Sequence, residues 1–128
     1  MEIETTLFRV DEPNIRGITY PKSVAEKIVQ QFQDDPSGWL GEATFPEGVG
    51  SIDLHRVSHE VIDLTLEDGE VKAKIRIMDT PMGKVLKQLV EADGKVSFAL
   101  SGTGTPEQHD VRPDDFELIQ IHGTIDGI

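Results

Sequence analysis

Hydrophobic and polar residues alternate most clearly between residues 71 and 78. The apolar side chains there take every second position, which is typical of a strand with one buried face: Val71, Ala73, Ile75 and Ile77. The four residues before this segment, 67–70, contain Asp68-Gly69 and have turn chemistry. Residues 51–66 are also strand-like, so we predict a β-hairpin. The candidate inward positions of its first strand are Ile52, Leu54, Val57, Val61 and Leu64.

Two segments follow the spacing of an amphipathic helix instead. The first begins at Pro21, a residue tolerated in the first turn, and ends at the Asp34-Asp35-Pro36 break. The second follows Thr80, an N-cap residue before Pro81, and ends at Gly94. The predicted apolar stripes are Val24, Ile28, Val29 and Phe32 in the first helix, and Val85, Leu86, Leu89 and Val90 in the second.

Three further strands are expected over residues 2–10, 95–101 and 116–125. Residues 38–50 are rich in glycine and are predicted to form an irregular loop, as is the turn-rich segment 102–113. Short strands joined by tight turns and two helices predict an α+β fold. We expect a small, mostly antiparallel sheet or barrel with two peripheral helices, in a single domain spanning residues 1–128.

Composition excludes several classes of site and of protein. The chain has 128 residues, an ordinary globular balance of apolar and charged residues, and no cysteine. The absence of cysteine excludes disulfides, thiol catalysis and cysteine–zinc sites. No apolar run reaches the ~20 residues of a membrane helix, and the first residues lack the pattern of a secretory signal.

The charge balance bears on partners. There are 24 acidic and 12 basic residues, giving a net charge of −12. Such a field repels phosphate backbones and anionic lipids, so we expect neither nucleic acid nor a membrane as a partner. It suits a basic protein partner, although the charge also serves solubility alone.

Four stretches, in order along the chain, resemble motifs of the prohead core protease family of tailed phages. The likeness extends over roughly residues 12–125, including the Gly102-Thr103-Gly104 loop and the segment from Asp114 to Leu118. The four stretches are Pro13-Asn14-Ile15-Arg16-Gly17-Ile18-Thr19-Tyr20-Pro21; Leu40-Gly41-Glu42 with Phe45-Pro46-Glu47; Ile52-Asp53-Leu54-His55-Arg56-Val57-Ser58-His59; and Asp79-Thr80-Pro81-Met82-Gly83-Lys84-Val85-Leu86.

This resemblance implies a fold similar to that of the herpesvirus assemblin proteases, a small barrel with outer helices. It implies a role in the assembling phage head, where the family cleaves scaffold and capsid proteins with a serine nucleophile and a histidine base. The implied partner is therefore a capsid protein, a scaffold protein or a protease of a phage head. The implied location is the host cytoplasm during infection, or the virion head.

The residues that the resemblance places at the catalytic positions depart from the family pattern. His59 takes the position of the base, but the nucleophile position holds Ala99, and a methyl group cannot attack a carbonyl. Ser101 stands where the family has an arginine, and Phe45 stands where it has a loop histidine. These departures favour natural loss of catalysis on a retained scaffold over an engineered knockout at Ala99.

A substitute nucleophile is the main alternative. Ser97 and Ser101 are each two residues from Ala99, so on a strand they share its face but lie about 6–7 Å from it. Because an error of ~1 Å can lower a rate on the order of a hundredfold, we expect neither serine to replace the lost one.

The other histidines have simple explanations. His55 and His59 would lie about 13 Å apart on a strand, too far to share a metal. His109 is expected to be solvated, and His122 to be structural, with a role beside His59 as the alternative. We predict no metal and no cofactor.

Three hypotheses follow from these observations. The first is a protease-like phage protein without catalysis that acts as a head assembly, capsid-associated or regulatory binding module. The second is an active maturation protease that uses Ser101 or Ser97. The third is a small phage effector that binds a host protein.

Overall fold

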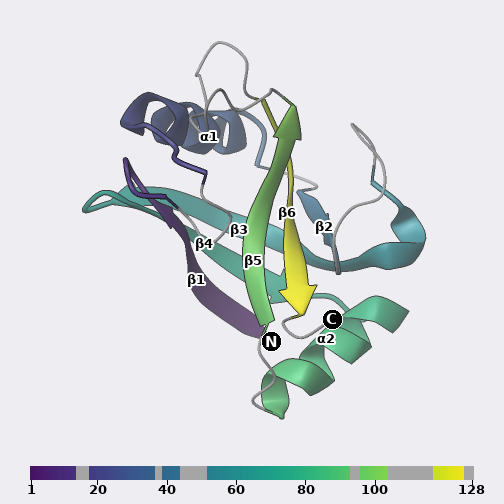
Figure 1. Ribbon diagram of the computed structural model, residues 1–128. Helices are drawn as coiled ribbons and strands as arrows, with labels where there is room; N and C mark the ends of the chain where they lie inside the picture. Colours follow the sequence, from purple (N-terminus) through teal and green to yellow (C-terminus); the bar gives the residue numbers. More distant parts are fainter. Residues whose placement is uncertain (14–17, 37–38, 44–51, 93–95, 104–116, 126–128) are drawn as a thin grey trace.

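The computed structural model describes the chain except for residues 14–17, 37–38, 44–51, 93–95, 104–116 and 126–128. Its elements follow the predicted order, with one added short strand and one added turn of 3₁₀ helix (Figure 1). They are β1 (Glu2–Arg9), α1 (Lys22–Asp34), β2 (Leu40–Glu42), η1 (Leu54–Arg56), β3 (Val57–Glu67), β4 (Glu70–Ile77), α2 (Pro81–Glu91), β5 (Val96–Thr103) and β6 (Glu117–Ile125).

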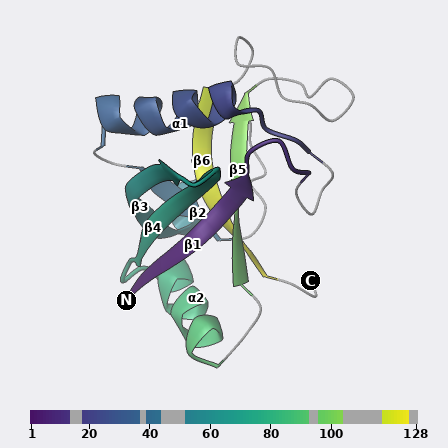
Figure 2. The ribbon, with the colours of Figure 1, turned by 90° about the vertical axis from the view of Figure 1, so that its left-hand side faces the viewer.

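The strands form an antiparallel sheet in the order β1-β4-β3-β2 and a hairpin of β5 with β6. An isolated parallel bridge from Ala43 to Gly123 connects β2 to β6. At the other side of the hairpin, β5 contacts β1. The hairpin therefore lies across the sheet and gives the strands a barrel-like arrangement, with α1 and α2 at opposite ends (Figures 1 and 2). This confirms the predicted α+β class.

The core lies between the inner face of the sheet and the hairpin. The alternation predicted for β4 is confirmed, because Val71, Ala73 and Ile75 are buried while the lysines between them point outward. Each large apolar side chain buried here contributes on the order of 1.5–3 kcal/mol. The other strands and both helices supply the rest of the core, chiefly Val24, Ile28, Phe32, Val61, Leu64, Leu86, Phe98, Leu100, Leu118 and Ile121.

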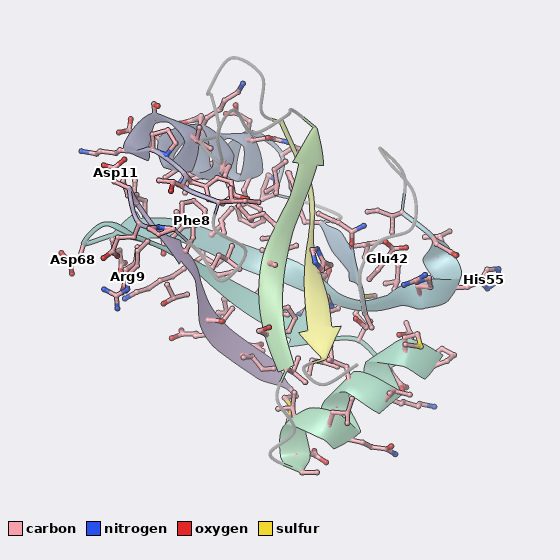
Figure 3. The ribbon with its side chains drawn as sticks, viewed as in Figure 1. Phe8, Arg9, Asp11, Glu42, His55 and Asp68 are labelled. Atoms are coloured by element: carbon pink, nitrogen blue, oxygen red, sulfur yellow. The ribbon has the colours of Figure 1, made fainter. Side chains whose placement is uncertain are left out.

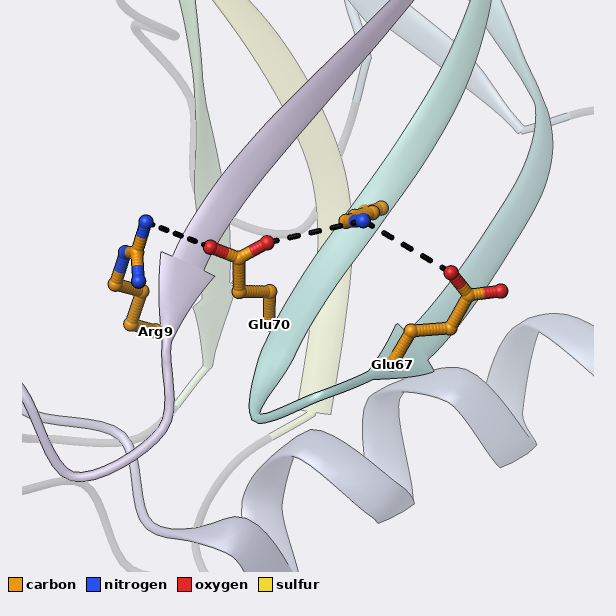
Figure 4. Close-up of polar contacts among 4 residues, drawn as sticks. Arg9, Glu67 and Glu70 are labelled. Atoms are coloured by element: carbon orange, nitrogen blue, oxygen red, sulfur yellow. Dashed lines mark ion pairs between the residues drawn. The ribbon is translucent and has the colours of Figure 1, made fainter.

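Charged residues cover the outer face of the sheet. The carboxylate of Glu70 forms an ion pair with Arg9, with 2.8 Å between Oε1 and the Nη2 atom of Arg9. Its other oxygen lies 3.8 Å from Nζ of Lys72, and this Nζ atom also lies 3.9 Å from Oε2 of Glu67 (Figure 4). Such exposed pairs contribute little, about 0–1 kcal/mol each. These charged side chains make the outer face of the sheet polar. The apolar, buried face is the opposite one, toward the hairpin.

Several predictions about the elements were wrong. The strand expected from Ser51 begins only at Val57, because the side chain of Asp53 accepts a hydrogen bond from the main-chain nitrogen of His55 and turns the chain into η1. Leu54, a predicted inward residue, is 73% exposed there. The loop predicted over residues 38–50 contains β2, and Pro21 is the N-cap of α1 and not its first residue. In α2, Leu86 is buried as predicted but Val85 is 43% exposed.

Candidate functional site

His59 lies on the inner face of β3, between Gly41 of β2 and Ile77 of β4 in the strand register. Its side chain is completely buried. A Cβ atom on Gly41 would lie 2.2 Å from the Nε2 atom of His59, so only glycine leaves room for the ring. The packing of the His59 ring therefore explains the glycine of the Leu40-Gly41-Glu42 motif.

Both ring nitrogens of His59 are engaged. Nε2 lies 2.7 Å from the main-chain oxygen of Ile121, and Nδ1 lies 2.7 Å from the hydroxyl of Ser58. A carbonyl oxygen only accepts hydrogen bonds, so Nε2 carries the proton and donates it. Nδ1 of the neutral ring then accepts from Ser58, which is itself fully buried. The only basic atom of the ring is therefore directed at an enclosed hydroxyl.

Burial also sets the charge state of this histidine. Loss of hydration lowers the pKa of His59 below its ordinary value of 6.5, and the hydrogen bond to Ile121 opposes this effect only in part. The neutral imidazole is thus the favoured form at neutral pH. It is held as a structural member of the core, with its ring edge-on to Phe98 at a centroid distance of 5.1 Å.

Ala99, the residue that the motifs place at the nucleophile position, lies on the other face of β5. Phe98 points inward to the ring of His59, and Ala99, the next residue, is half-buried on the opposite side. In the register of the hairpin, Ala99 lies directly opposite His122 of β6. The structure therefore does not bring Ala99 and His59 to one face, and places a different histidine beside Ala99.

The two candidate substitute serines lie on the same strand. Ser97 is exposed and lies opposite Thr124. The main chain of Ser101 pairs with that of Gln120, just before a register shift at Gly102. The side chain of Ser101 is not among those that the structure describes. Phe45, which the resemblance places where the family has a loop histidine, and His109 lie outside the described residues. His55 is exposed on η1, and not on the strand of His59 as predicted (Figure 3).

A buried polar pair, Glu42 of β2 with Gln120 of β6, was not predicted from the sequence. The main-chain nitrogen of Glu42 donates to the side-chain oxygen of Gln120 at 2.9 Å, and the amide of Gln120 donates to the carboxylate of Glu42 at 2.7 Å. The second carboxylate oxygen accepts from the main-chain nitrogen of Asp53 at 2.9 Å. Glu42, labelled in Figure 3, is 2% exposed. The Leu40-Gly41-Glu42 motif was the one feature of the sequence that pointed to this residue.

The Asp79-Thr80-Pro81-Met82-Gly83-Lys84 motif forms the start of α2. Thr80 caps the helix by accepting from the nitrogen of Gly83 at 2.9 Å, and its hydroxyl donates to the carbonyl of Val57 at 2.6 Å. A Cβ atom on Gly83 would lie 1.9 Å from the main-chain oxygen of Met78. The predicted N-cap is confirmed, and the motif anchors the helix to β3 beside Ser58 and His59.

No group of three or more histidine, aspartate or glutamate side chains is arranged to hold a metal ion in the parts that the structure describes. Neither described helix is long and apolar enough to cross a membrane.

Comparison with known proteins gives a match in structure. No family model matches the sequence. No curated protein matches it either. The fold is similar to that of a phage capsid assembly protease. The solved structure is that of the bacteriophage T4 capsid assembly protease, gp21, with a TM-score of 0.79 and 21% identity, covering 97% of this chain and 81% of that chain. The fold expected from the four motifs is thus confirmed.

Proposed function

We propose that this chain is a catalytically inactive protein with the fold of a phage capsid assembly protease, and that it binds a protein of the phage head during assembly. One observation carries the proposal: β5 has a methyl group at Ala99, and the His59 imidazole is turned away from that position. His59 is buried against Phe98 and Ile121. A serine protease needs a hydroxyl and an imidazole in hydrogen-bond reach of each other and of substrate.

The proposed partner is a capsid protein, a scaffold protein or the active protease of the same phage head. The likeness in fold to a capsid assembly protease supports this choice. The net charge of −12 favours a partner segment rich in lysine and arginine. The proposed location is the infected cell, and the head if the partner retains the protein there.

The test has a chemical part. We expect no covalent labelling of the wild-type chain by a fluorophosphonate probe, and no cleavage of scaffold or capsid protein from the same phage. Labelling of Ser97 or Ser101, mapped by mass spectrometry, would show a working substitute nucleophile and refute the proposal. The variant Ala99→Ser should recover little peptidase activity, because Ser101 and Phe45 still replace the family residues. Strong cleavage by this variant would instead indicate a site that lacks only its serine.

The second part measures binding. Purified capsid, scaffold and protease proteins from the same phage are titrated against the chain by calorimetry at low and high salt. We expect one of them to bind, with an affinity that falls as salt rises, because charge attraction is screened. If none binds at either salt concentration, the binding role fails even if the absence of catalysis holds.

A further inference from the structure

We propose that the open edge of β1 is a docking site for an extended segment of the partner, which adds to the sheet as an antiparallel strand and carries lysine or arginine at alternate positions. The inference rests on the proposed binding function, and it names the surface that is used and the chemistry of the segment that binds there. The residues whose main chain forms this surface are Glu2, Glu4 and Thr6, and we call them the β1 edge.

β1 lies at the border of the four-stranded sheet. One side of the strand pairs with β4 from Glu2 to Arg9. On the other side, no ladder or bridge joins β1 to β5 in the part of the chain that the structure describes. Figure 2 shows β5 crossing β1 at an angle instead of running beside it. This side of β1 is therefore open to a further strand.

The ladder with β4 decides which main-chain groups face the open side. The nitrogen of Ile77 donates to the oxygen of Met1 at 2.9 Å, so these two residues form a hydrogen-bonded pair. In an antiparallel ladder such pairs alternate with pairs whose N–H and C=O groups point away from each other. The groups that point away from β4 are therefore those of Glu2, Glu4 and Thr6. Unpaired groups in a row at a sheet edge are the ones that accept an added strand.

The side chains of the β1 edge indicate the charge of that strand. All three are exposed. Glu2 forms an ion pair with Lys74 at 3.3 Å, whereas Glu4 has no ion-pair partner among the described residues. Opposite charges at directly opposite positions stabilise a strand pair. The residues that face Glu2 and Glu4 should therefore be lysine or arginine.

The inner side of the same edge indicates the residues between them. Ile3 is half-buried and packs against the core. Because successive side chains of a strand point to opposite faces, every second residue of the added strand would lie beside Ile3 on the inner side. An apolar side chain there covers the part of Ile3 that is still exposed. The expected segment thus alternates basic and apolar residues.

A second copy of this chain fits the β1 edge less well. Two β1 strands paired about a two-fold axis at Glu4 would place the two Glu4 carboxylates opposite each other. An axis at Ile3 would place Glu2 opposite Glu4. Like charges at directly opposite positions destabilise a strand pair. The carboxylates thus disfavour self-association and leave the edge to a basic segment.

Hydrogen exchange of the full chain, measured by NMR without a ligand, tests the edge itself. The amides of Ile3 and Thr5 face β4 and should exchange slowly, whereas those of Glu4 and Thr6 should exchange at least about tenfold faster. Equal protection of all four amides would show that the edge is already covered, and overturns the inference.

The binding probe is the hexapeptide Lys-Val-Lys-Val-Lys-Val with blocked ends, titrated against the full chain by calorimetry and by NMR. We expect saturable binding that protects the amides of Glu4 and Thr6 from exchange. The same peptide with glutamate in place of lysine should not bind. Failure of the lysine peptide to bind, or equal binding of the two peptides, overturns the inference.

Methylation of the peptide nitrogens separates strand addition from charge attraction. In antiparallel addition the lysines lie opposite Glu2, Glu4 and Thr6 in hydrogen-bonded pairs, so the lysine N–H groups point to β1 and the valine N–H groups point away. Methylating the lysine main-chain nitrogens should weaken binding more than about tenfold, and methylating the valine nitrogens less than about threefold. The reverse order, or no difference, overturns antiparallel strand addition.

Two variants of the protein test the position of the charge. Glu4→Lys should weaken binding of the lysine peptide about tenfold, because it places like charges opposite each other. Glu26→Lys makes the same change of net charge at an exposed residue of α1 and should weaken binding less than about threefold, since distant charges are screened. Equal losses would assign the binding to net charge alone and overturn the inference.

Competition with the head proteins separates this inference from the proposed function. We expect the lysine peptide to displace the head protein that binds, and Glu4→Lys to weaken that complex. If a head protein binds wild type and Glu4→Lys equally and the peptide does not displace it, the inference fails and the proposed function stands. If the peptide binds as expected but no head protein does, the proposed function fails and the β1 edge remains a site for a basic strand.

Discussion

The Nε2 atom of His59 lies 2.7 Å from the main-chain oxygen of Ile121, and this hydrogen bond connects the sheet to the hairpin. β3 and β6 are not paired in any ladder of the described residues, so this bond is a direct polar link between the two strands. We therefore expect His59 to stabilise the folded protein. His59→Ala should lower the free energy of unfolding by about 3 kcal/mol, because it leaves a cavity and a buried carbonyl without a donor.

Urea denaturation of both proteins measures this loss. His55→Ala is the matched control, since His55 is exposed on η1 four residues earlier. It should change the free energy of unfolding by less than about 0.5 kcal/mol. Equal stabilities for His59→Ala and the wild type would contradict a structural role for His59.

The pKa of the same histidine predicts a pH dependence. Burial lowers the pKa of His59 in the folded protein below the 6.5 of the unfolded chain. Between the two values the unfolded state binds more protons, so the stability from the neutral ring is complete above pH 7 and is lost as pH falls below about 6.5. The slope from this group is at most about 1.4 kcal/mol per pH unit.

Denaturation curves collected from pH 5.5 to 7.5 test this dependence. Other groups also titrate in this range, so the useful quantity is the difference between wild type and His59→Gln, whose amide does not titrate. The wild type should lose more stability than the variant on acidification. Parallel curves for the two proteins would mean that His59 has the same pKa folded and unfolded.

Gly41 provides a third prediction. A methyl group there would meet Nε2 of His59 at 2.2 Å and the main-chain oxygen of Ile121 at 2.4 Å, so Gly41→Ala should cost more than about 3 kcal/mol. Gly69→Ala is the control: Gly69 has a φ of 75° but no atom within 4 Å of an added Cβ, and the cost should be about 1 kcal/mol of backbone strain. Thermal unfolding followed by circular dichroism should rank the two in this order. The reverse ranking would show that His59 does not occupy the space beside Gly41.

The sequence pattern was sufficient to predict those elements of the fold that depend only on residues close together in the chain. The alternation of β4 and the Thr80-Pro81 start of α2 could be predicted, because each depends on neighbouring residues alone. The strand β2 could not, since three residues are too few to show a period and its position is set by pairing with distant strands.

The arrangement of the site was less predictable for a related reason. His59 and Ala99 could both be found from motifs, but the face that each takes depends on the registers of three strand pairs. These registers contain irregularities, including one between Gly41 and Glu42 beside His59 and another between Ser101 and Gly102 beside Ala99. A shift of one residue exchanges the two faces of a strand, and the sequence has no signal that marks where such a shift occurs.

The pairing of Glu42 with Gln120 allows a prediction of coupling. Each side chain satisfies the other in a buried place, so Glu42→Ala and Gln120→Ala should each destabilise the protein by about 2 kcal/mol by leaving a partner without its hydrogen bonds. The double variant removes both groups and should cost less than the sum of the two, with a coupling energy of about 1–3 kcal/mol. A matched cycle on Glu60 and Arg76, which form an exposed ion pair between β3 and β4, should give less than about 1 kcal/mol. Urea denaturation of the seven proteins (the wild type and three variants for each cycle) measures both coupling energies, and additive effects at Glu42 and Gln120 would show that the two side chains do not act as a unit.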